Sequence, residues 1–544
     1  MKKTLVFLAA TLFAIGCASP EKMAKLADNV KIECTPQVLE VVNGGIDAIV
    51  SVTYPEGYFN PKVVLEVTPV IVYDGGEAAL TPLKYQGEKV KNNYKVVSKD
   101  GQKVTEQLHF DYEEGMEQCH LELRGKVLAG SKSINLPVKK VADGAITTYM
   151  LVKDNGQLAF KKDNYQDVIA STTEGQIKYL VNSAEVRNSE LKGQSVKNFL
   201  NALDAIAADE RTTVTSTEIV AYASPEGAVE RNNQLSGNRS QSASKAWNKV
   251  TKGHEAAAPS VRSVGEDWDG FSKLVAESDL EDKDLILRVL SMYSDPNVRE
   301  NEIRNMSQVY TALKGEVLPE LRRARLIANV EFKNYTNEEL LDLLNSNADV
   351  LDEEALLRTA SVVKDAAQKA DIYQKAIDKF GSERARYNLA VLCLQDGQLQ
   401  KAAANLSGLK NDGDIMNAKG VLALRNGDYA TAQDYFRKAG TPEAKANLGA
   451  ALICTGAYDE AANVLAGVEG CCHNTVLAYI LSDQLDKAEL AARCASPEVA
   501  YLKAIIAARK GNADKVSENL NSAFRNPAFR ERASRDIEFA GYEF

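Results

Sequence analysis

Histidine is scarce in this sequence of 544 residues, and no group of residues forms a familiar catalytic motif. None of the four histidines lies in a serine–histidine–aspartate, HExxH or paired-cysteine context. They are His109, His120, His254 and His473. A glycine-rich phosphate loop is also missing, and most carboxylates fall on predicted helix faces, where they are solvated. We therefore expect no enzyme, no cofactor and no metal site.

Long apolar runs and excess positive charge are missing as well. Beyond the start of the chain, no stretch reaches the roughly 20 apolar residues that span a bilayer. The formal net charge is -10 at pH 7. Nothing would offset phosphate repulsion, so we expect no binding of nucleic acid and no direct binding of anionic lipid.

The first residues resemble a lipoprotein signal peptide. Two lysines precede an apolar run over residues 4–15, which is too short to span a bilayer. The run leads into Ala14-Ile15-Gly16-Cys17, which resembles a lipobox with Ala in place of the usual Leu. The resemblance implies removal of residues 1–16, lipidation of Cys17 and a tether over residues 17–27. A plain secretory signal that contains a cysteine is the alternative.

The other cysteines carry weaker information. Cys34 and Cys119 fall in one strand-rich segment, and export would permit a disulfide between them, although spacing alone does not show one. Cys471-Cys472-His473 has the residue types of metal ligands but lacks a second ligand pair at zinc spacing, so a structural role is favoured. Three more are predicted to be small core residues of apolar helices: Cys393, Cys454 and Cys494.

Residues 28–148 are predicted to form a β domain. Runs rich in valine, isoleucine and threonine alternate with polar residues over 46–54, 63–73 and 118–124. Turn signals such as Asn43-Gly44-Gly45 separate them. About seven short strands at this spacing predict an antiparallel β-sandwich of immunoglobulin type.

Residues 170–335 alternate strand and helix patterns and are predicted to form an α/β domain. The predicted strands cover residues 176–181, 213–223, 260–265 and 325–332, and the predicted helices cover 190–209 and 230–252. About fifty further helical residues, 267–318, are inserted before the last strand.

Part of this domain resembles the C-terminal domain of the OmpA family, which anchors the outer membrane to peptidoglycan. The resemblance rests on the spacing Asn232-x-x-Leu235-Ser236-x-x-Arg239. It implies that Arg239 and its neighbour on the motif, Asn232, contribute to a peptidoglycan site. Arg239 would bind the carboxylate of diaminopimelate, because a guanidinium donates two parallel hydrogen bonds. Packing of Leu235 and Arg239 on one helix face is an alternative explanation.

The family's acidic partner of this arginine is replaced here. That aspartate lies fifteen residues before the arginine, a position occupied by Ser224 in this sequence. A hydroxyl cannot offset the charge of an ammonium group. We expect Glu226 to replace the acid if the loop folds back, and we expect weak or absent binding otherwise.

Residues 336–544 are predicted to be helical and repetitive. Three glycines recur at intervals of 30 and 29 residues, each with a small residue seven positions before it and an alanine five positions after it. The triplets are Ala390-Gly397-Ala402, Gly420-Gly427-Ala432 and Gly449-Gly456-Ala461. The pattern resembles the tetratricopeptide repeat family, with a period shorter than the usual 34 residues. It implies stacked helix pairs around a concave groove that binds protein partners. An irregular helical bundle is the alternative.

Taken in order, these segments look like a lipoprotein architecture common in Bacteroidetes. We expect a multidomain scaffold for protein–protein interactions, anchored by lipid in the outer membrane with the periplasmic face favoured. Contact with peptidoglycan through Ser224, Glu226, Asn232 and Arg239 is the further expectation. A dedicated subunit of an outer-membrane secretion or assembly machine is the alternative, and an enzyme is least favoured.

Overall fold

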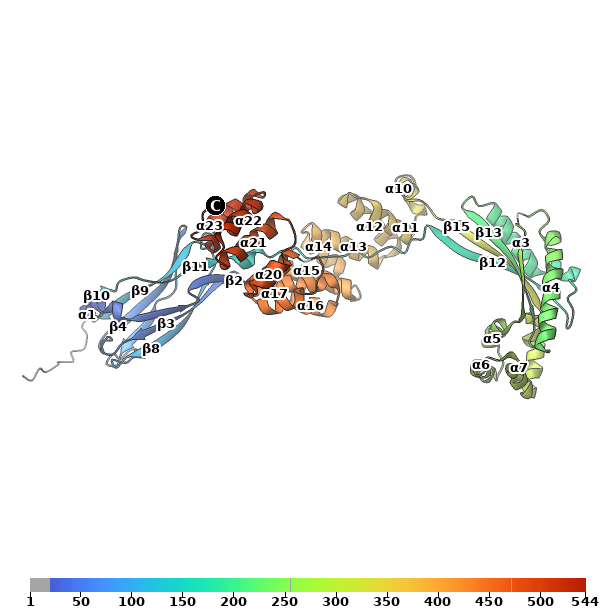
Figure 1. Ribbon diagram of the computed structural model, residues 1–544, viewed down its shortest axis with the longest axis horizontal. Coiled ribbons are helices and arrows are strands. Elements are labelled where there is room, and N and C mark those ends of the chain that lie inside the picture. Colours follow the sequence, from blue (N-terminus) through green and yellow to red (C-terminus); the bar gives the residue numbers. More distant parts are fainter. Residues whose placement is uncertain (1–19, 255, 471) are drawn as a thin grey trace, which may run out of the picture. The chain divides into compact units, whose positions relative to one another are not determined.

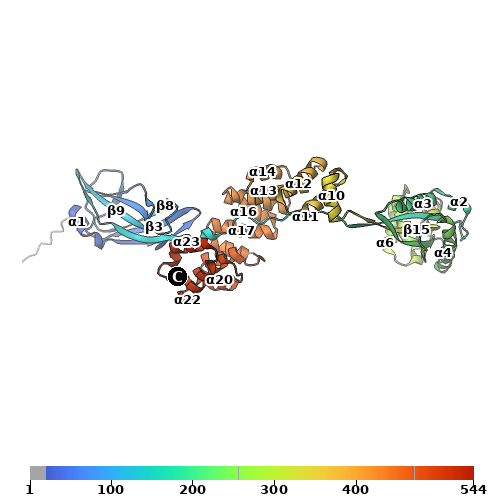
Figure 2. The same ribbon diagram turned by 90° about the horizontal axis from the view of Figure 1, so that it is seen from above.

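The computed structural model describes residues 20–254, 256–470 and 472–544 (Figures 1 and 2). The chain forms two compact units, one of residues 1–161 and 365–544 and one of residues 162–364. The chain therefore forms the first part of one unit, then the whole of the second unit, and then the rest of the first. Cys17 with its predicted signal peptide, and Cys471, lie outside the described residues. No helix in the described part is long and apolar enough to cross a membrane.

The first unit begins with a β-sandwich. Its strands are β1 (Lys31–Thr35), β2 (Val38–Val42), β3 (Gly45–Tyr54), β4 (Val64–Tyr73), β5 (Gly76–Ala79), β6 (Leu83–Gly87), β7 (Lys95–Val97), β8 (Gln102–Asp111), β9 (Cys119–Ala129), β10 (Lys132–Asn135) and β11 (Lys139–Ile146), preceded by helix α1 (Pro20–Lys25). Strands β1, β3 and β8 form one layer, and β11, β9, β4, β6 and β7 form the other. Strand β2 pairs with β3 and with β11, so it joins the two layers.

Alternating residues of both layers make the core of the sandwich. Ile46 and Val50 of β3 pack in the same buried cluster as Leu121 and Val127 of β9. This period of two is the pattern that predicted the strands. The two cysteines of the sandwich are free: Cys34 lies on β1, and Cys119 lies on β9 in the other layer. The disulfide that export would permit is therefore not formed.

The rest of the first unit is an array of antiparallel helices. They are α12 (Ala366–Phe380), α13 (Glu383–Gln395), α14 (Leu399–Leu406), α15 (Gly413–Arg425), α16 (Tyr429–Ala439), α17 (Pro442–Cys454), α18 (Tyr458–Leu465), α19 (Cys472–Leu481), α20 (Leu485–Ala491), α21 (Pro497–Arg509), α22 (Ala513–Ala523) and α23 (Pro527–Arg535). Successive helices from α13 to α22 pack as pairs, and one continuous core runs through all of them. The predicted stack of helical repeats is confirmed.

The glycines and alanines act as the repeat pattern predicts. Gly397, Gly427 and Gly456 follow the first helix of their pairs with φ of 74°, 76° and 79°, a conformation that side chains disfavour. Gly420 packs against Phe436 so closely that a Cβ atom there would lie 2.5 Å from the ring. Of the three predicted core cysteines, Cys393 and Cys454 are buried, but Cys494 is exposed in the loop after α20. That prediction was wrong for Cys494, because the helix ends at Ala491 before reaching it.

The second unit contains a four-stranded sheet in the order β12-β15-β13-β14. Its elements are β12 (Val168–Lys178), α2 (Asn188–Leu191), α3 (Gln194–Ala207), β13 (Thr212–Ala223), α4 (Val229–Val250), β14 (Ser260–Glu266), α5 (Trp268–Glu277), α6 (Lys283–Met292), α7 (Pro296–Asn305), α8 (Ser307–Glu316), α9 (Leu318–Leu321), β15 (Arg323–Lys333), α10 (Asn337–Ser346) and α11 (Glu353–Val362). Helices α3 and α4 pack on the sheet, with Phe199 and Trp247 in contact at 5.9 Å between ring centroids. Helices α5 to α9 have a separate small core.

Two boundaries differ from the sequence predictions. The first strand was predicted over 176–181 but spans Val168–Lys178. Its first half lies at the sheet edge with exposed side chains, so it shows no alternating apolar pattern. Helices α10 and α11 belong to the second compact unit, although the repetitive segment was predicted to begin at 336.

Candidate functional site

The groove of the helical array holds a segment of the chain itself. After strand β11 and a short 3-10 helix at Thr148–Leu151, residues 152–161 have no regular secondary structure. They run along the first helices of successive pairs, from the C-terminal pairs toward the N-terminal ones (Figure 1). We call residues 152–161 the linker.

Three asparagines of the array each bind one linker residue through both of its main-chain groups. In each case the amide oxygen accepts the N–H, and the amide nitrogen donates to the C=O. Asn474 binds Lys153 (2.9 and 2.8 Å), Asn447 binds Gln157 (2.6 and 2.9 Å) and Asn388 binds Lys161 (2.8 and 2.9 Å). Because the contacts are to the main chain, they recognise an extended backbone whatever its side chains are.

A fourth asparagine extends this row. Asn417 donates to the carbonyl oxygen of Gln157 at 2.8 Å and accepts from Asn447 at 2.8 Å. Each of the four asparagines is at most 5% exposed. A buried amide without a partner costs about 1–3 kcal/mol, so the linker satisfies groups that would otherwise destabilise the array. We call Asn388, Asn417, Asn447 and Asn474 the asparagine row.

Other side chains of the array bind carbonyl groups of the linker and of Leu151, the residue before it. Tyr387 donates to the carbonyl of Ala159 at 2.9 Å, and Arg425 donates to that of Asn155 through Nε at 3.1 Å and Nη2 at 2.6 Å. His473 Nε2 lies 2.6 Å from the carbonyl oxygen of Leu151. Burial lowers the pKa of His473, so the neutral ring with its proton on Nε2 is favoured.

Side chains of the linker are recognised at only a few points. Gly156 has φ of 82°, and a Cβ atom there would lie 2.5 Å from a methyl group of Val421. Leu158 and Phe160 are partly buried against the array core. Lys161 forms an ion pair with Asp412 and lies over the ring of Tyr387, 5.3 Å from its centroid.

The predicted arginine of the α/β domain also binds carbonyl groups. Arg239 lies on α4 and is 1% exposed. It donates to the main-chain oxygens of Ser183 (3.0 Å), Tyr222 (2.9 Å) and Leu180 (3.2 Å). No carboxylate is among these partners, and burial lowers the pKa of Arg239 to about 10. Arg239 therefore joins the loop after β12 to the end of β13.

Two of the other predicted residues lie together, but a different arginine joins them. Ser224 donates to Glu226 at 2.6 Å, and both oxygens of Glu226 accept from Arg322, at 3.0 and 2.9 Å. Burial alone would raise the pKa of Glu226, but these hydrogen bonds hold it below its usual value. Asn232 holds the same loop by donating to Gly227 at 2.9 Å, and it also binds Glu266 at 2.7 Å.

The α/β cluster is therefore closed by its own contacts. Ser224 and Glu226 do meet, as the folded-back loop requires, but the charge of Glu226 is balanced by Arg322 rather than left for a ligand ammonium group. Sequence reasoning missed Arg322 as a partner. Its position just before the last strand was visible, but nothing in the spacing indicated which acid it would meet.

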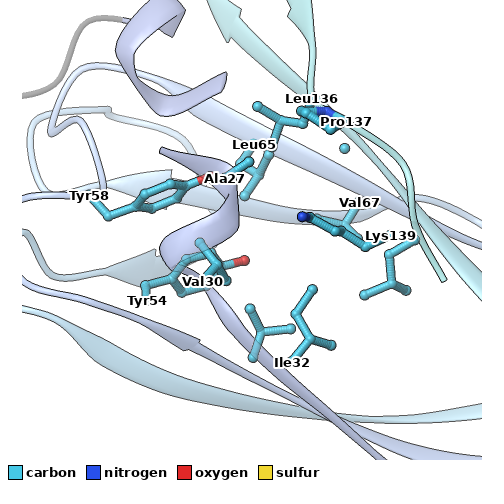
Figure 3. A pocket seen from close by; sticks show the side chains of 13 residues that line it. Ala27, Val30, Ile32, Tyr54, Tyr58, Leu65, Val67, Leu136, Pro137 and Lys139 are labelled. Carbon is cyan, nitrogen blue, oxygen red and sulfur yellow. The ribbon is translucent and has the colours of Figure 1, made fainter. Parts of the chain in front are cut away.

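The β-sandwich contains an apolar cavity that is too small to be a candidate ligand-binding site. About 50 Å³ of space lies between Tyr54, Tyr58 and Lys139, among apolar side chains (Figure 3). Ligand pockets typically measure roughly 300–1,000 Å³, so this cavity is too small for a ligand. In the described part of the chain, no group of three or more histidine, cysteine or acidic side chains could hold a metal ion.

Sequence reasoning also missed the asparagine row. Asn388, Asn447 and Asn474 each precede by nine residues the residue that turns the chain between paired helices: Gly397, Gly456 and Asp483. A polar residue that recurs at one slot of an apolar helix is a signal of shared function, and it could have been found from the sequence.

Comparisons with known proteins find solved structures that are similar to parts of this chain. No family model matches the chain, and no curated protein matches it. Among solved structures, a tetratricopeptide repeat protein from Parabacteroides merdae is 13% identical with a TM-score of 0.30, covering 37% of this chain and 91% of that one. YrrB, a TPR protein with an unusual peptide-binding site, is 17% identical with a TM-score of 0.23, covering 37% of this chain and 100% of that one.

A third similar structure is the Cut9–Hcn1 hetero-tetramer of APC/C. It is 14% identical with a TM-score of 0.32, and the match covers 57% of this chain and 72% of that one. All three values of the TM-score are low, so the assignment of a repeat array rests on the helix pairs and turn residues of this chain.

Proposed function

We propose that the protein is an exported lipoprotein, attached to the outer membrane through Cys17, that acts as a scaffold for protein–protein interactions. The observation that carries the proposal is the asparagine row, which binds a polypeptide main chain along the groove of the array. Neutral amides at fixed intervals suit recognition of an extended peptide and supply no acid, base or nucleophile.

The α/β domain supports a weaker part of the proposal, a contact with peptidoglycan. An OmpA-like domain agrees with β13, α4 and β14, which form a parallel strand–helix–strand unit with Arg239 on the helix. Against strong wall binding, Arg239 already binds three carbonyl groups, and Glu226 already pairs with Arg322. We therefore propose that wall contact is weak and that Arg239 is mainly structural.

An immunoglobulin-type sandwich at the N-terminal end completes the proposed architecture. Its support is the strand order, with β3 beside β8 in one layer and β4, β9 and β11 adjacent in the other. This order follows the B–E and C–F–G pairings of that fold.

The anchor is tested by Cys17→Ala. Acyl incorporation should be lost, and the protein should move from the membrane pellet to the soluble fraction of the envelope, because no helix among the described residues could cross a membrane. A matched control is Cys494→Ala, which removes an exposed cysteine and should change neither readout. Full membrane retention of Cys17→Ala without acyl label would contradict the anchor.

The scaffold role is tested by crosslinking in intact cells, followed by purification of the protein and identification of its partners. Several envelope proteins are expected. One abundant membrane partner in a constant ratio would instead favour the alternative, a dedicated subunit of a secretion or assembly machine. Recovery of no partner would contradict both.

A further inference from the structure

Among the described residues, the linker fills the groove in which the helical array binds a polypeptide main chain. We propose that the linker is an internal ligand that blocks the groove, and that an extended peptide of another protein takes its place when the linker leaves. The proposal rests on the scaffold function above and specifies how its binding site is regulated and what it binds.

The linker lies in the groove in a way that permits it to leave. Lys153, Asp154, Asn155 and Gln157 are exposed, and the apolar side chains of the linker are only partly buried. The asparagines that bind it, in contrast, are at least 95% buried on well-packed helices. Removing the linker would therefore open a row of amides to solvent without taking any side chain from the buried core of the array.

The contacts define what a replacement must look like. The asparagine row requires an extended backbone, but it sets few limits on side chains. Val421 requires a glycine at the position of Gly156. Asp412 and the ring of Tyr387 favour a lysine five residues later, and the array core favours apolar side chains at the positions of Leu158 and Phe160. The ligand class is thus an extended glycine-x-apolar-x-aromatic-lysine peptide.

The attachment of the linker explains how it would regulate binding. A segment tethered beside its site competes at an effective concentration on the order of millimolar. A weak partner peptide would therefore be excluded from the intact chain. A partner that binds more tightly, or one that meets a chain with a weakened linker, would enter.

The test measures binding of one probe, a fluorescein-labelled peptide of residues 151–162 (LVKDNGQLAFKK), to the purified mature chain. Two variants, the opened variants, weaken the binding of the linker to the groove: Gly156→Val, which collides with Val421, and replacement of residues 152–161 by ten glycine and serine residues, which removes the side-chain contacts of Leu158, Phe160 and Lys161. Gly130→Val is the matched control, because Gly130 also has a positive φ, 59°, but a Cβ atom there would meet no other atom within 4 Å. Circular dichroism checks that helix content is unchanged.

We expect the wild type and Gly130→Val to bind the peptide weakly and both opened variants to bind at least ten-fold more tightly. Adding Asn447→Ala to the glycine–serine variant should remove most of that gain, because it removes the bidentate contact at the centre of the row. If Gly156→Val does not fold, the glycine–serine variant decides the result.

Two results would overturn the proposal. Equal binding by the wild type and the opened variants would mean that the linker does not block the groove. Absence of binding to the opened variants would mean that the groove holds this segment only while it is part of the same chain. The peptide assay needs neither the lipid nor a cell. A negative result would therefore not contradict the anchored scaffold, which the Cys17→Ala variant and the crosslinking experiment test separately.

Discussion

The groove of the array and the Arg239 site of the α/β domain both bind carbonyl groups of their own chain, but with different chemistry. In the groove, neutral amides bind a segment whose polar side chains face solvent. In the α/β domain, a guanidinium that is 1% exposed binds carbonyls of the loop after the edge strand β12 and of the inner strand β13. A neutral amide loses little when its partner is exchanged for water, whereas a buried charge loses much. The comparison predicts an exchangeable site in one unit and a permanent structural contact in the other.

The largest expected effect is from Arg239→Ala. The change leaves three carbonyl groups without their donor and a cavity in the α/β domain, so unfolding of that domain should become easier by about 3–5 kcal/mol. Arg231→Ala, at an exposed position of the same helix, is the control and should change little. Chemical denaturation followed by tryptophan fluorescence measures both. A stable Arg239→Ala variant would mean that the arginine is available for a ligand.

The next effect is from Asn447→Ala, which removes two contacts to Gln157 and one to Asn417. We expect a loss of about 1–3 kcal/mol and faster hydrogen exchange at the Gln157 amide. Asn519→Ala is the control, because Asn519 binds only the carbonyl of Lys515 on its own helix. Equal exchange rates in the two variants would show that the asparagine row does not hold the linker.

A smaller effect is expected from Ser224→Asp, which restores the acid of the OmpA family. The new carboxylate would replace a hydroxyl that donates to Glu226, and the two acids would share Arg322. We expect a loss of stability of about 1 kcal/mol and no gain in a pull-down with purified sacculi. A clear gain in sacculus binding would restore the family's mode of recognition and weaken the contrast between the two sites.

The smallest effect concerns pH and His473. Burial lowers the pKa of this histidine below its unfolded value of 6.5, so the unfolded chain takes up the proton first as the pH falls. The contribution of His473 to stability is therefore complete above pH 6.5 and is lost as the pH falls from 6.5 toward its lowered folded pKa. Lys153 adds to this shift, whereas Glu498 and the bond to Leu151 oppose it.

His473→Gln is the matched variant, because its amide can still donate to Leu151 but does not titrate in this range. The difference in thermal midpoint between pH 7.5 and pH 5.5 should be larger for the wild type than for His473→Gln. The same difference in both proteins would remove His473 from the contacts that hold the linker.

The sequence could predict the array and not the content of its groove, and the reason is physical. Small residues such as Gly420 and turn residues such as Gly427 are demanded by close packing and a positive φ, so they leave a periodic signature. Asparagine at the slots of Asn388, Asn447 and Asn474 leaves one too. The linker leaves none, because its backbone is bound and most of its side chains are free to vary.

The Arg239 site of the α/β domain could also be predicted only in part from the sequence. Asn232 and Arg239 were predicted to lie on one helix, and both lie on α4. Their partners are main-chain oxygens of Leu180, Ser183, Tyr222 and Gly227, and an acid on the next strand, Glu266. No sequence pattern encodes which carbonyl group a loop will present. Residue identity gave the donors here, and only the fold gave the acceptors.

The return of the chain to the first unit has a consequence for a nicked molecule. The sandwich and linker end at residue 161, and the array begins at residue 365, yet the two pieces share one unit. Glu117 pairs with Arg535 at 3.3 Å, Thr148 bonds to Glu538 at 2.7 Å, and the asparagine row binds the linker. A protease that excised residues 162–364 would thus leave two fragments that remain associated, as in a reassembled split protein. The linker would be the C-terminal segment of one fragment, bound in the groove of the other.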